Sequence, residues 1–381
     1  MSIASEKNRV VAFVSNSAWS VYNFRFDVIR HLIQRGYQIL VLAPDDEYSG
    51  YLIDLGCRFI PVDFNNKKEN PVVDYFFYRR LKKLYAAHQP DFIFHYVAKP
   101  NIYGSMAAAS LNIPSVAVIT GLGYPFAKRN WLYWVVKHLY RKALKKTTQV
   151  WFLNNEDAKV FVNEKIINIE RTKVLPGEGI NTSFFSPEIV EHKKLGKKFT
   201  FLMSTRLLKS KGIGLYADAA RILIKKNYDA QFVLIGFFEK NHPDSITQED
   251  LSRWEKEGLI SYKGFAKDVR PFLQSADCLV FPSFYNEGIP RCLMEASSME
   301  LPVITSMNRG CKEVVMNNSS GYLCNVNDPF DLADKMEKMI NLSAEERSRM
   351  GKNGRLLVIK KFNVGRVIEE YEDTLNQDLL D

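Results

Sequence analysis

The protein has 381 residues, of which 46% are hydrophobic and 25% are charged. The chain is longer than a typical domain with one hydrophobic core, and its composition is that of a globular protein. We therefore expect a globular protein of two domains. No apolar run reaches the roughly eighteen residues that cross a bilayer, and we expect no signal peptide at the start. The five cysteines include no Cys-x-x-Cys pair, which argues against a disulfide framework or a zinc site and fits a reducing cytoplasm.

The formal net charge of +9 is confined to the first half of the chain. Residues 1–185 contain 24 Lys and Arg against 15 Asp and Glu, whereas residues 186–381 contain 28 of each. This distribution predicts an anionic partner for the first half only. Nucleic acid, a lipid surface and a phosphorylated substrate all stay open, because charge alone does not distinguish them.

The first half alternates apolar segments with amphipathic ones. We predict strands at 10–15, 37–44, 57–62, 91–97 and 115–120, and helices at 24–36, 74–88 and 103–111. Strands that alternate with helices favour a parallel sheet with helices on both faces.

A segment with glycines and prolines, 174–187, predicts the crossing into a second domain. The pattern then restarts, with strands at 198–205, 231–236, 259–264, 277–283 and 301–305, and with helices at 215–226, 290–299 and beyond residue 329. The expected fold is therefore α/β, with two Rossmann-like, doubly wound domains.

We place the two domains at 1–185 and 186–365, and we expect the last helix, about 366–381, to pack back on the first domain. In sheets of this kind, ligands bind at the carboxyl ends of the strands. Two such sheets facing each other would place the site in the cleft between them.

The segment FPSFYNEGIPRCLMEA, 281–296, contains two glutamates with seven residues between them, Glu287 and Glu295. Gly288 lets the backbone approach a ligand, and Pro290 suits the first turn of a helix whose free amides would favour a phosphate. Glu295 lies too far inside that helix to stabilise its dipole, so each glutamate is expected to bind its own hydroxyl group. A capped core helix with two solvated glutamates is the alternative.

Two cations, Arg206 and Lys211, lie in the loop after the strand 198–205. Arg can hold phosphate oxygens with two parallel bonds and Lys acts as a point charge, so together with the helix N-terminus they would hold a diphosphate. A solvated loop is the alternative. The chain has no Asp-x-Asp, the pair with which sugar-nucleotide enzymes often hold Mg²⁺ or Mn²⁺, and this favours a diphosphate held without metal.

These residues resemble those of the family-four retaining glycosyltransferases, which have the two-domain GT-B fold. The resemblance covers nearly the whole chain, and in the second half it includes PGEGIN (176–181), STRLLKSKG (204–212), VLIGF (233–237) and LPVITSMNRGCKEVV (301–315). In the first half, the segments at 23–46 and 99–126 are similar to the branch that builds bacterial surface polysaccharides and lipid-linked oligosaccharides.

The resemblance implies a role for each matching position. Glu295 would bind the ribose hydroxyls, Glu287 would contact the donor sugar, and both Arg206 and Lys211 would neutralise the leaving diphosphate. Amides of the segment Gly288, Ile289, Pro290, Arg291 and Cys292 would hold diphosphate and sugar hydroxyls, and Lys263 to Phe265 would present backbone to the base. On the acceptor side the resemblance places Asn16, Ser17, Asn23, Arg25, His95, Lys99, Thr120, Gly121, Gly123 and Tyr124.

Two positions depart from the family pattern, and a third allows two interpretations. The first loop reads SNSAWSVYNFR, without the Gly-Gly pair that is common in the family. Glu300 stands where a glycine is common before Leu-Pro, and we interpret it as a turn variant. His95 has two open interpretations, an active-site histidine of the family type or a buried residue with structural partners.

The resemblance implies transfer of a hexose or N-acetylhexosamine from a nucleoside-diphosphate sugar, with UDP as the expected nucleotide, to a hydroxyl group with retention of configuration. The acceptor would be a polysaccharide or a polyisoprenyl-diphosphate glycan. The leaving diphosphate would take the acceptor proton, so we name no protein base. No cofactor or metal is expected.

The segment 126–146 predicts a helix that mixes aromatic and basic residues, and 75–85 repeats this composition. Such a helix suits an anionic lipid surface, although packing of its aromatics on the sheet is the alternative. Because the basic excess lies in the acceptor half, we expect a cytoplasmic protein in peripheral contact with anionic lipid at the inner face of the cell membrane.

Three other functions stay open. A sugar-nucleotide epimerase of GT-B-like fold would need general bases in the cleft and no second sugar. A nucleic-acid-binding protein is disfavoured by the neutral second half and the missing signature. A non-catalytic nucleotide-sugar binding protein is disfavoured by the presence of Glu287, Arg206 and Lys211.

Overall fold

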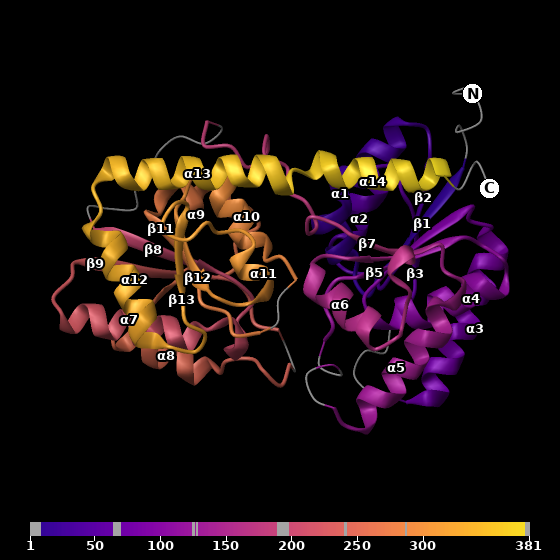
Figure 1. The fold of residues 1–381 in the computed structure, drawn as a ribbon, viewed down its shortest axis with the longest axis horizontal. Coiled ribbons are helices and arrows are strands. Elements are labelled where there is room, and N and C mark those ends of the chain that lie inside the picture. The colour runs from indigo at the N-terminus through magenta and orange to yellow at the C-terminus, as the bar shows by residue number, and fades with distance from the viewer. Residues whose placement is uncertain are drawn as a thin grey trace. The chain divides into compact units, whose positions relative to one another are not determined.

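The computed structural model describes residues 9–63, 70–123, 126, 129–188, 198–239, 242–285 and 288–377. The chain divides into two compact units, Met1–Gly179 with Val364–Asp381, and Ile180–Asn363. The sequence placed this boundary after residue 185. In each unit, helices cover both faces of a sheet, and every strand pair recorded in the described residues is parallel (Figure 1).

The sheet of the first unit has the strand order β3-β2-β1-β4-β5-β6-β7. Its strands are β1 Val10–Val14, β2 Gln38–Ala43, β3 Arg58–Pro61, β4 Phe92–Tyr96, β5 Ser115–Ile119, β6 Gln149–Phe152 and β7 Thr172–Val174. The central strands β4 and β5 are buried along their whole length, as a parallel sheet covered on both faces requires. The predicted strands do not include β6 and β7, which are only four and three residues long.

The helices of the first unit begin with α1, whose start differs from the prediction. Residues 16–25 were expected to form a loop, but α1 spans Ala18–Gln34, because the Ser17 hydroxyl caps it by accepting from the Ser20 amide. The other helical segments are α2 Ser49–Asp54, α3 Pro71–His88, the π-helix Pro100–Gly104, α4 Ser105–Ser110, α5 Trp131–Ala143, α6 Asn155–Asn163 and α14 Val364–Gln377, with short 3₁₀ turns at Leu144–Lys146 and Ile169–Arg171.

The last helix, α14, belongs to the first unit and packs beside α1 (Figure 1). Its Tyr371 ring lies 4.6 Å from the Phe94 ring and 4.9 Å from the Trp151 ring, measured between centroids. The Tyr371 and Tyr96 hydroxyl oxygens are 2.7 Å apart and share a hydrogen bond. The end of the chain therefore completes the core that the first 179 residues begin.

The sheet of the second unit has the strand order β10-β9-β8-β11-β12-β13. Its strands are β8 Phe199–Ser204, β9 Ala230–Ile235, β10 Ser261–Tyr262, β11 Cys278–Phe281, β12 Val303–Ser306 and β13 Gly321–Cys324. Its helices are α7 Ile213–Lys225, α8 Gln248–Lys256, α9 Arg270–Ser275, α10 Arg291–Ser298, α11 Arg309–Lys312, α12 Pro329–Asn341 and α13 Ala344–Phe362, with a 3₁₀ turn at Lys209–Lys211. The two doubly wound parallel units predicted from the sequence are confirmed. Glu300, with φ 58°, occupies the left-handed conformation expected of a turn.

Each sheet reverses its direction of growth at one point. In the first unit the chain moves outward from β1 to β2 and then returns to add β4 on the other side of β1. In the second unit the same reversal separates β8 from β11. The loops that follow the two strands at this reversal lead to opposite faces of the sheet. The point of reversal is called the switch point, and open α/β sheets bind ligands there.

One glycine is required by the packing of a loop at the second switch point. Gly236 has φ 150°, and a Cβ added there would lie 1.7 Å from the Thr205 carbonyl oxygen. Its amide donates to the Gly264 carbonyl at 2.9 Å, so the segment cannot shift without losing that bond. The geometry of the loop around Arg206 therefore requires a residue without a side chain at position 236.

We predict that Gly236→Ala destabilises the second unit by about 2–4 kcal/mol, through backbone strain and overpacking. The matched control is Gly214→Ala at the start of α7, where a Cβ meets nothing within 4 Å. That change should be neutral or stabilising by up to about 1 kcal/mol. Urea-unfolding curves of both variants check this, and equal midpoints for the two would contradict the packing described.

Candidate functional site

The loops that follow β8 and β11 are bonded to each other at the switch point of the second unit. The Phe284 amide donates to the Ser210 carbonyl at 3.0 Å, and the Ser283 hydroxyl donates to the same carbonyl at 3.2 Å. Gly212, with φ 84°, lets the chains approach, because a Cβ there would lie 2.2 Å from the Pro282 carbonyl oxygen. The loop after β8 and the loop after β11, which were identified separately from the sequence, are therefore joined by hydrogen bonds.

Lys211 ends the 3₁₀ turn in this joined loop and is only 7% exposed. Its ammonium nitrogen lies 5.3 Å from the centre of the Tyr285 ring and 6.0 Å from that of Phe281. Cation–π attraction stabilises a desolvated ammonium at such distances. The arrangement holds a positive charge beside the segment that leads to α10.

Arg206 lies at the end of β8 and is half exposed. Its guanidinium donates to a carboxylate oxygen of Glu239, which follows β9, at 2.7 Å. Because both side chains are more than a third exposed, the pair contributes little to stability and can exchange partners easily. A diphosphate could therefore replace the Glu239 carboxylate on Arg206.

The helix α10 is shorter at both ends than the predicted 290–299. Pro290 is the N-cap, with ψ 122°, and the helix runs from Arg291 to Ser298. Because Pro290 keeps an extended ψ, helical geometry starts one residue later than expected. The first residues, Arg291 and the partly exposed Cys292, present the amides that the sequence assigned to a phosphate. Ile289 is buried in the core and anchors the turn, while Gly288 is half buried.

Glu295 is mostly buried one turn into α10. One of its carboxylate oxygens lies 2.8 Å from the Arg291 Nε, an ion pair with i,i+4 spacing. The family resemblance predicts that this carboxylate binds the ribose hydroxyls of the nucleotide. Arg291 orients the Glu295 carboxylate through one of its oxygens, and a carboxylate can accept more than one hydrogen bond.

Lys263 and Phe265 follow the short strand β10. The Lys263 amide donates to the Leu234 carbonyl at 2.9 Å, and its side chain is exposed. Phe265 is 46% exposed, and its ring stands perpendicular to the Phe237 ring with 5.7 Å between centroids. The expected base-contacting segment thus offers an exposed aromatic ring beside its backbone. Two predicted residues, Glu287 and Tyr124, lie outside the described residues.

In the first unit, two predicted acceptor residues directly follow Ser15 after β1, and two others lie in α1. Asn16 and Ser17 are half buried, and Ser17 caps α1. Asn23 lies within α1, and its side-chain amide donates to the Trp19 carbonyl at 2.9 Å. Both Ser17 and Asn23 therefore have local partners.

Arg25 is 4% exposed and forms an ion pair with Glu178, which lies next to the point where the chain passes into the second unit. Its guanidinium carbon lies 4.4 Å from the centre of the Tyr96 ring. Burial alone would lower the pKa of Arg25, but the Glu178 carboxylate raises that pKa, and the net change is upward. Arg25 is therefore a fixed cation. The sequence did not identify Glu178, although it lies in the quoted PGEGIN segment.

A pocket of about 70 Å³ lies at this first switch point. Its wall includes Val21 and Phe24 from α1, Val97 after β4, and Thr120 after β5. Gly121 and Gly123, with φ 151° and 70°, continue the Thr120 segment in conformations that favour glycine. The predicted residues Arg25 and Thr120 thus meet at one place.

His95 and Lys99 are held by protein partners. His95 is fully buried, with one ring nitrogen 3.0 Å from the Tyr85 hydroxyl and the other 3.4 Å from the Ser105 hydroxyl. Burial lowers the pKa of His95 to about 3, so the ring is neutral. These contacts favour the structural interpretation of His95. Lys99 forms an ion pair with Asp74, with 2.9 Å between Nζ and Oδ1.

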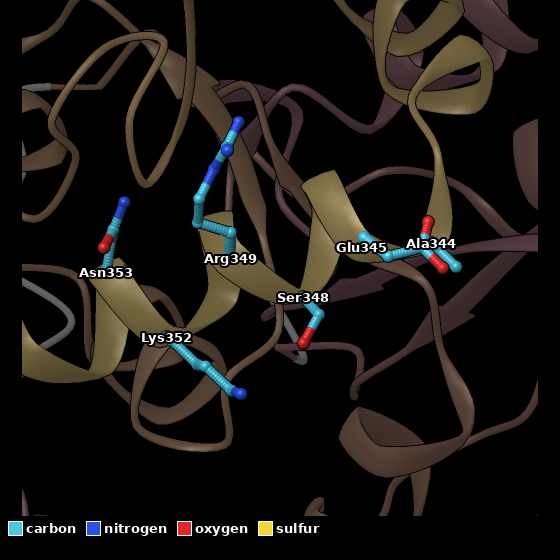
Figure 2. Close-up of a pocket in the computed structure, with 6 residues that line it drawn as sticks. All are labelled: Ala344, Glu345, Ser348, Arg349, Lys352 and Asn353. Carbon is cyan, nitrogen blue, oxygen red and sulfur yellow. The ribbon is translucent and has the colours of Figure 1, made fainter.

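A second hollow lies along α13 and is distant in sequence from every predicted residue. Figure 2 shows its lining residues on that helix: Ala344, Glu345, Ser348, Arg349, Lys352 and Asn353. All six come from one surface helix, and none comes from a strand end. The switch points, and not this hollow, gather the residues that the sequence singled out.

The described residues contain no group of three or more His, Cys, Asp or Glu side chains placed to hold a metal ion. Among the same residues, we find no helix with the length and hydropathy needed to span a bilayer.

The chain matches two protein-family models. One is described as "Glycosyl transferases group 1" and covers residues 185–357, and the other as "Glycosyl transferase 4-like" and covers residues 10–154. A relative from Campylobacter jejuni, N,N'-diacetylbacillosaminyl-diphospho-undecaprenol alpha-1,3-N-acetylgalactosaminyltransferase, is 31% identical over 346 residues, which is 87% of this chain and 89% of the relative. The chain is a family-four (group 1) glycosyltransferase.

Two further similarities support the assignment of this chain to the glycosyltransferases. UDP-Gal:alpha-D-GlcNAc-diphosphoundecaprenol alpha-1,3-galactosyltransferase from Escherichia coli is 27% identical and covers 92% of this chain and 89% of its own length. The solved structure of Anabaena HepE in complex with UDP and glucose has a TM-score of 0.82 at 18% identity, over 97% of this chain and 100% of that one. This likeness shows that the two share the GT-B fold.

The buried neutral His95 of the glycosyltransferase predicts a pH dependence of stability. Its ordinary pKa is 6.5, and the folded value is about 3. Between these values the unfolded chain binds a proton that the folded chain does not, so stability should fall as the pH drops below 6.5. The slope from this group approaches about 1.4 kcal/mol per pH unit.

Urea unfolding at pH 7 and pH 5 checks this prediction with His95→Gln. The variant should lose part of the pH dependence, while a His88→Gln control at the less buried end of α3 should keep it. Identical slopes for His95→Gln and the unchanged protein would contradict a neutral buried ring.

Proposed function

We propose that this glycosyltransferase transfers a hexose or N-acetylhexosamine from a nucleoside-diphosphate sugar, UDP-linked, to a lipid-linked or polysaccharide acceptor in bacterial surface-glycan synthesis, with retention of configuration. The observation that carries the proposal is the joined loop at β8 and β11, which brings Lys211 beside the segment before α10. Arg206 follows β8 and belongs to the same loop as Lys211. Cations and a helix N-terminus at one switch point suit a diphosphate.

The chemistry follows from the charges that develop during transfer. When the bond from the sugar carbon to the diphosphate breaks, negative charge grows on the leaving group, and in this proposal Arg206 and Lys211 stabilise that charge. One such preorganised group contributes about 3–4 kcal/mol to lowering a barrier. The leaving diphosphate would accept the proton of the attacking hydroxyl. Glu287 remains the predicted contact to the donor sugar, and no metal or cofactor is proposed.

The acceptor part of the proposal rests on the relatives and on charge. Both named relatives act, by name, on sugars linked to diphospho-undecaprenol. The basic excess of this chain lies in its first 185 residues, which suits an acceptor that carries a diphosphate and lies in an anionic membrane. We therefore propose a polyisoprenyl-diphosphate glycan as the acceptor.

Two helices of the first unit support peripheral contact with the inner face of the cell membrane. On α5, Trp131 and Trp134 are 70% and 57% exposed, and on α3, Phe76 is 65% exposed. Exposed basic side chains accompany them: Arg79, Arg80, Lys83, Arg141, Lys142, Lys145 and Lys146. The alternative, in which the aromatics pack on the sheet, does not apply to these three rings. Exposed aromatic rings among cations suit an anionic lipid surface.

We predict that Arg206→Ala lowers kcat by about 10²–10³-fold. Stability should change by less than about 1 kcal/mol, because the Arg206–Glu239 pair is exposed. The assay follows UDP release from a panel of UDP-sugars, with and without GlcNAc-diphosphoundecaprenol. Arg253→Ala is the control, since it removes a similar exposed pair, with Asp250, from α8. Turnover of Arg206→Ala within a few-fold of the unchanged protein would refute the role of this cation.

The membrane contact is tested with vesicles of phosphatidylcholine, alone or mixed with phosphatidylglycerol. The protein should bind the anionic vesicles at low salt and lose most of that binding at high salt. Trp131→Ser with Trp134→Ser should weaken binding by at least about tenfold, because two exposed aromatic surfaces are lost.

The matched control for this pair is Phe330→Ser with Leu356→Ser, which removes two side chains of 74% and 65% exposure from the second unit. It should leave vesicle binding unchanged. If the unchanged protein does not sediment with anionic vesicles at low salt, the membrane contact is wrong, whereas the chemistry at Arg206 is unaffected.

A further inference from the structure

The joined loop at the second switch point consists of the segments after β8 and β11 that meet at the Ser210 carbonyl. The strand order β9-β8-β11-β12 makes the loops after β9 and β12 its neighbours. Each neighbour contributes one polar side chain that bonds to the joined loop, Asp244 after β9 and Asn308 after β12. Neither residue was predicted from the sequence to belong to the site.

Asp244 binds two consecutive residues of the turn that contains Lys211. Its carbonyl accepts from the Lys209 amide at 2.7 Å. Its carboxylate accepts from the Ser210 amide at 3.1 Å and also from the Ser210 hydroxyl. The carbonyl of the same Ser210 accepts from the loop after β11. Because Ser210 is bonded on both sides, the position of the next residue, Lys211, depends on Asp244.

The segment that carries Asp244 is itself bonded to the loop after β8. The Leu207 amide donates to the Phe237 carbonyl at 2.9 Å, and the Ile246 amide donates to the Leu207 carbonyl at 3.0 Å. The Asp244 amide donates to Nδ1 of His242 at 3.1 Å. Backbone bonds before and after Asp244 therefore place its carboxylate, which acts as a fixed acceptor and not as a mobile surface charge.

Asn308 contacts the joined loop from the β12 side. Its side-chain amide donates to the Tyr285 carbonyl, and to the Ser283 carbonyl at 3.4 Å. Its side-chain oxygen accepts from the Arg309 amide at 2.7 Å. Asn308 is only 8% exposed, and a buried polar side chain that is bonded in this way specifies one arrangement of the backbone it contacts.

Tyr285 connects Asn308 to the same cation. The centre of the Tyr285 ring lies 5.3 Å from the Lys211 ammonium nitrogen. Asp244 thus acts on the residue before Lys211, and Asn308 acts on the residue whose ring lies beside it. A charged group stabilises a transition state when it is in place before the reaction, and a displacement of about 1 Å can lower the rate by about 10²-fold.

We propose that Asp244 and Asn308 are positioning residues for glycosyl transfer. They hold Lys211 and the segment before α10 in the arrangement that stabilises the negative charge on the leaving diphosphate. Neither side chain contacts the donor, and each acts through the joined loop. For the role of Lys211, this assignment rests on the proposed function.

Three substitutions separate positioning from folding. Asp244→Ala removes the acceptor, Asp244→Asn keeps an acceptor oxygen at the same place, and Asn308→Ala removes the donor to the loop after β11. Asp328→Ala is a control, because its carboxylate accepts from two backbone amides at the start of α12. Asn353→Ala is the other, because its amide donates to a carbonyl near α13. Thermal unfolding of all five variants measures the cost to the fold.

Kinetics with UDP-sugars and GlcNAc-diphosphoundecaprenol give the main result. Asp244→Ala and Asn308→Ala should lower kcat by about 10- to 100-fold, because the placement of charge matters most as the bond breaks. The KM for the UDP-sugar should rise by no more than about tenfold. Asp244→Asn should keep kcat within about fivefold of the unchanged protein, since its oxygen still accepts from Ser210. Both controls should keep the unchanged kcat.

A double-mutant cycle with Lys211→Met tests whether the two residues act through this cation. Adding Asp244→Ala or Asn308→Ala to Lys211→Met should lower kcat by less than about threefold, whereas independent effects would multiply.

Milder variants serve where an alanine variant does not fold. Ser210→Ala deletes only the hydroxyl that bonds to Asp244, and it should give a smaller loss of kcat with the same coupling to Lys211→Met. Asn308→Asp keeps the acceptor for the Arg309 amide and deletes the donor, so it should lose kcat as Asn308→Ala does.

UDP binding, measured by isothermal titration calorimetry, separates this assignment from the proposed function. If no UDP-sugar is turned over, the proposed function fails. Asp244→Ala and Asn308→Ala should still weaken UDP binding about three- to tenfold, with the same coupling to Lys211→Met.

Four results would overturn the positioning role. The first is kcat and UDP affinity that Asp244→Ala and Asn308→Ala leave near the unchanged values. The second is multiplication of their effects with that of Lys211→Met. The third is an equal loss of activity in the controls at an equal fall in unfolding temperature. The fourth is failure of the unchanged protein to bind UDP, because no diphosphate would then occupy the joined loop.

Discussion

The reversal of strand order in each parallel sheet is the constraint on which the rest of the structure depends. It parts the loops that leave β1 and β4 in the first unit, and those that leave β8 and β11 in the second. In the second unit, hydrogen bonds to the Ser210 carbonyl join the two loops beside Lys211. In the first unit, the gap remains as a pocket whose wall includes the Arg25–Glu178 pair.

The two switch points differ in how their positive charges are partnered. In the second unit, Lys211 is held by aromatic rings, and Arg206 has an exposed carboxylate partner that an anion can replace. In the first unit, Arg25 is neutralised by a buried carboxylate. A buried pair of this kind is costly to break, so it presents polarity without net charge. We propose the diphosphate site only at the second switch point, where the recorded carboxylate partner of Arg206 is partly exposed.

The apolar strands and the order of motifs allowed the fold and the two loops to be predicted from sequence. The strands β6, β7 and β13 were missed because they are short and carry no long apolar run. The start of α1 was missed because its cap, Ser17, was interpreted as part of a ligand-binding loop. Glu178 could not be identified, since its partner Arg25 is far away in sequence. Burial of His95 and its contacts with Tyr85 and Ser105 favour the structural interpretation, and neither can be seen in the sequence.

The central claim is that Arg206, Lys211 and the first amides of α10 hold the diphosphate of the donor. A crystal structure of the protein with a bound UDP-sugar tests it most directly. The account predicts diphosphate oxygens within hydrogen-bond distance of Arg206, Lys211 and the amide of Arg291 or Cys292, with the Glu239 carboxylate displaced from Arg206. A diphosphate bound elsewhere, for instance along the α13 hollow of Figure 2, would contradict it.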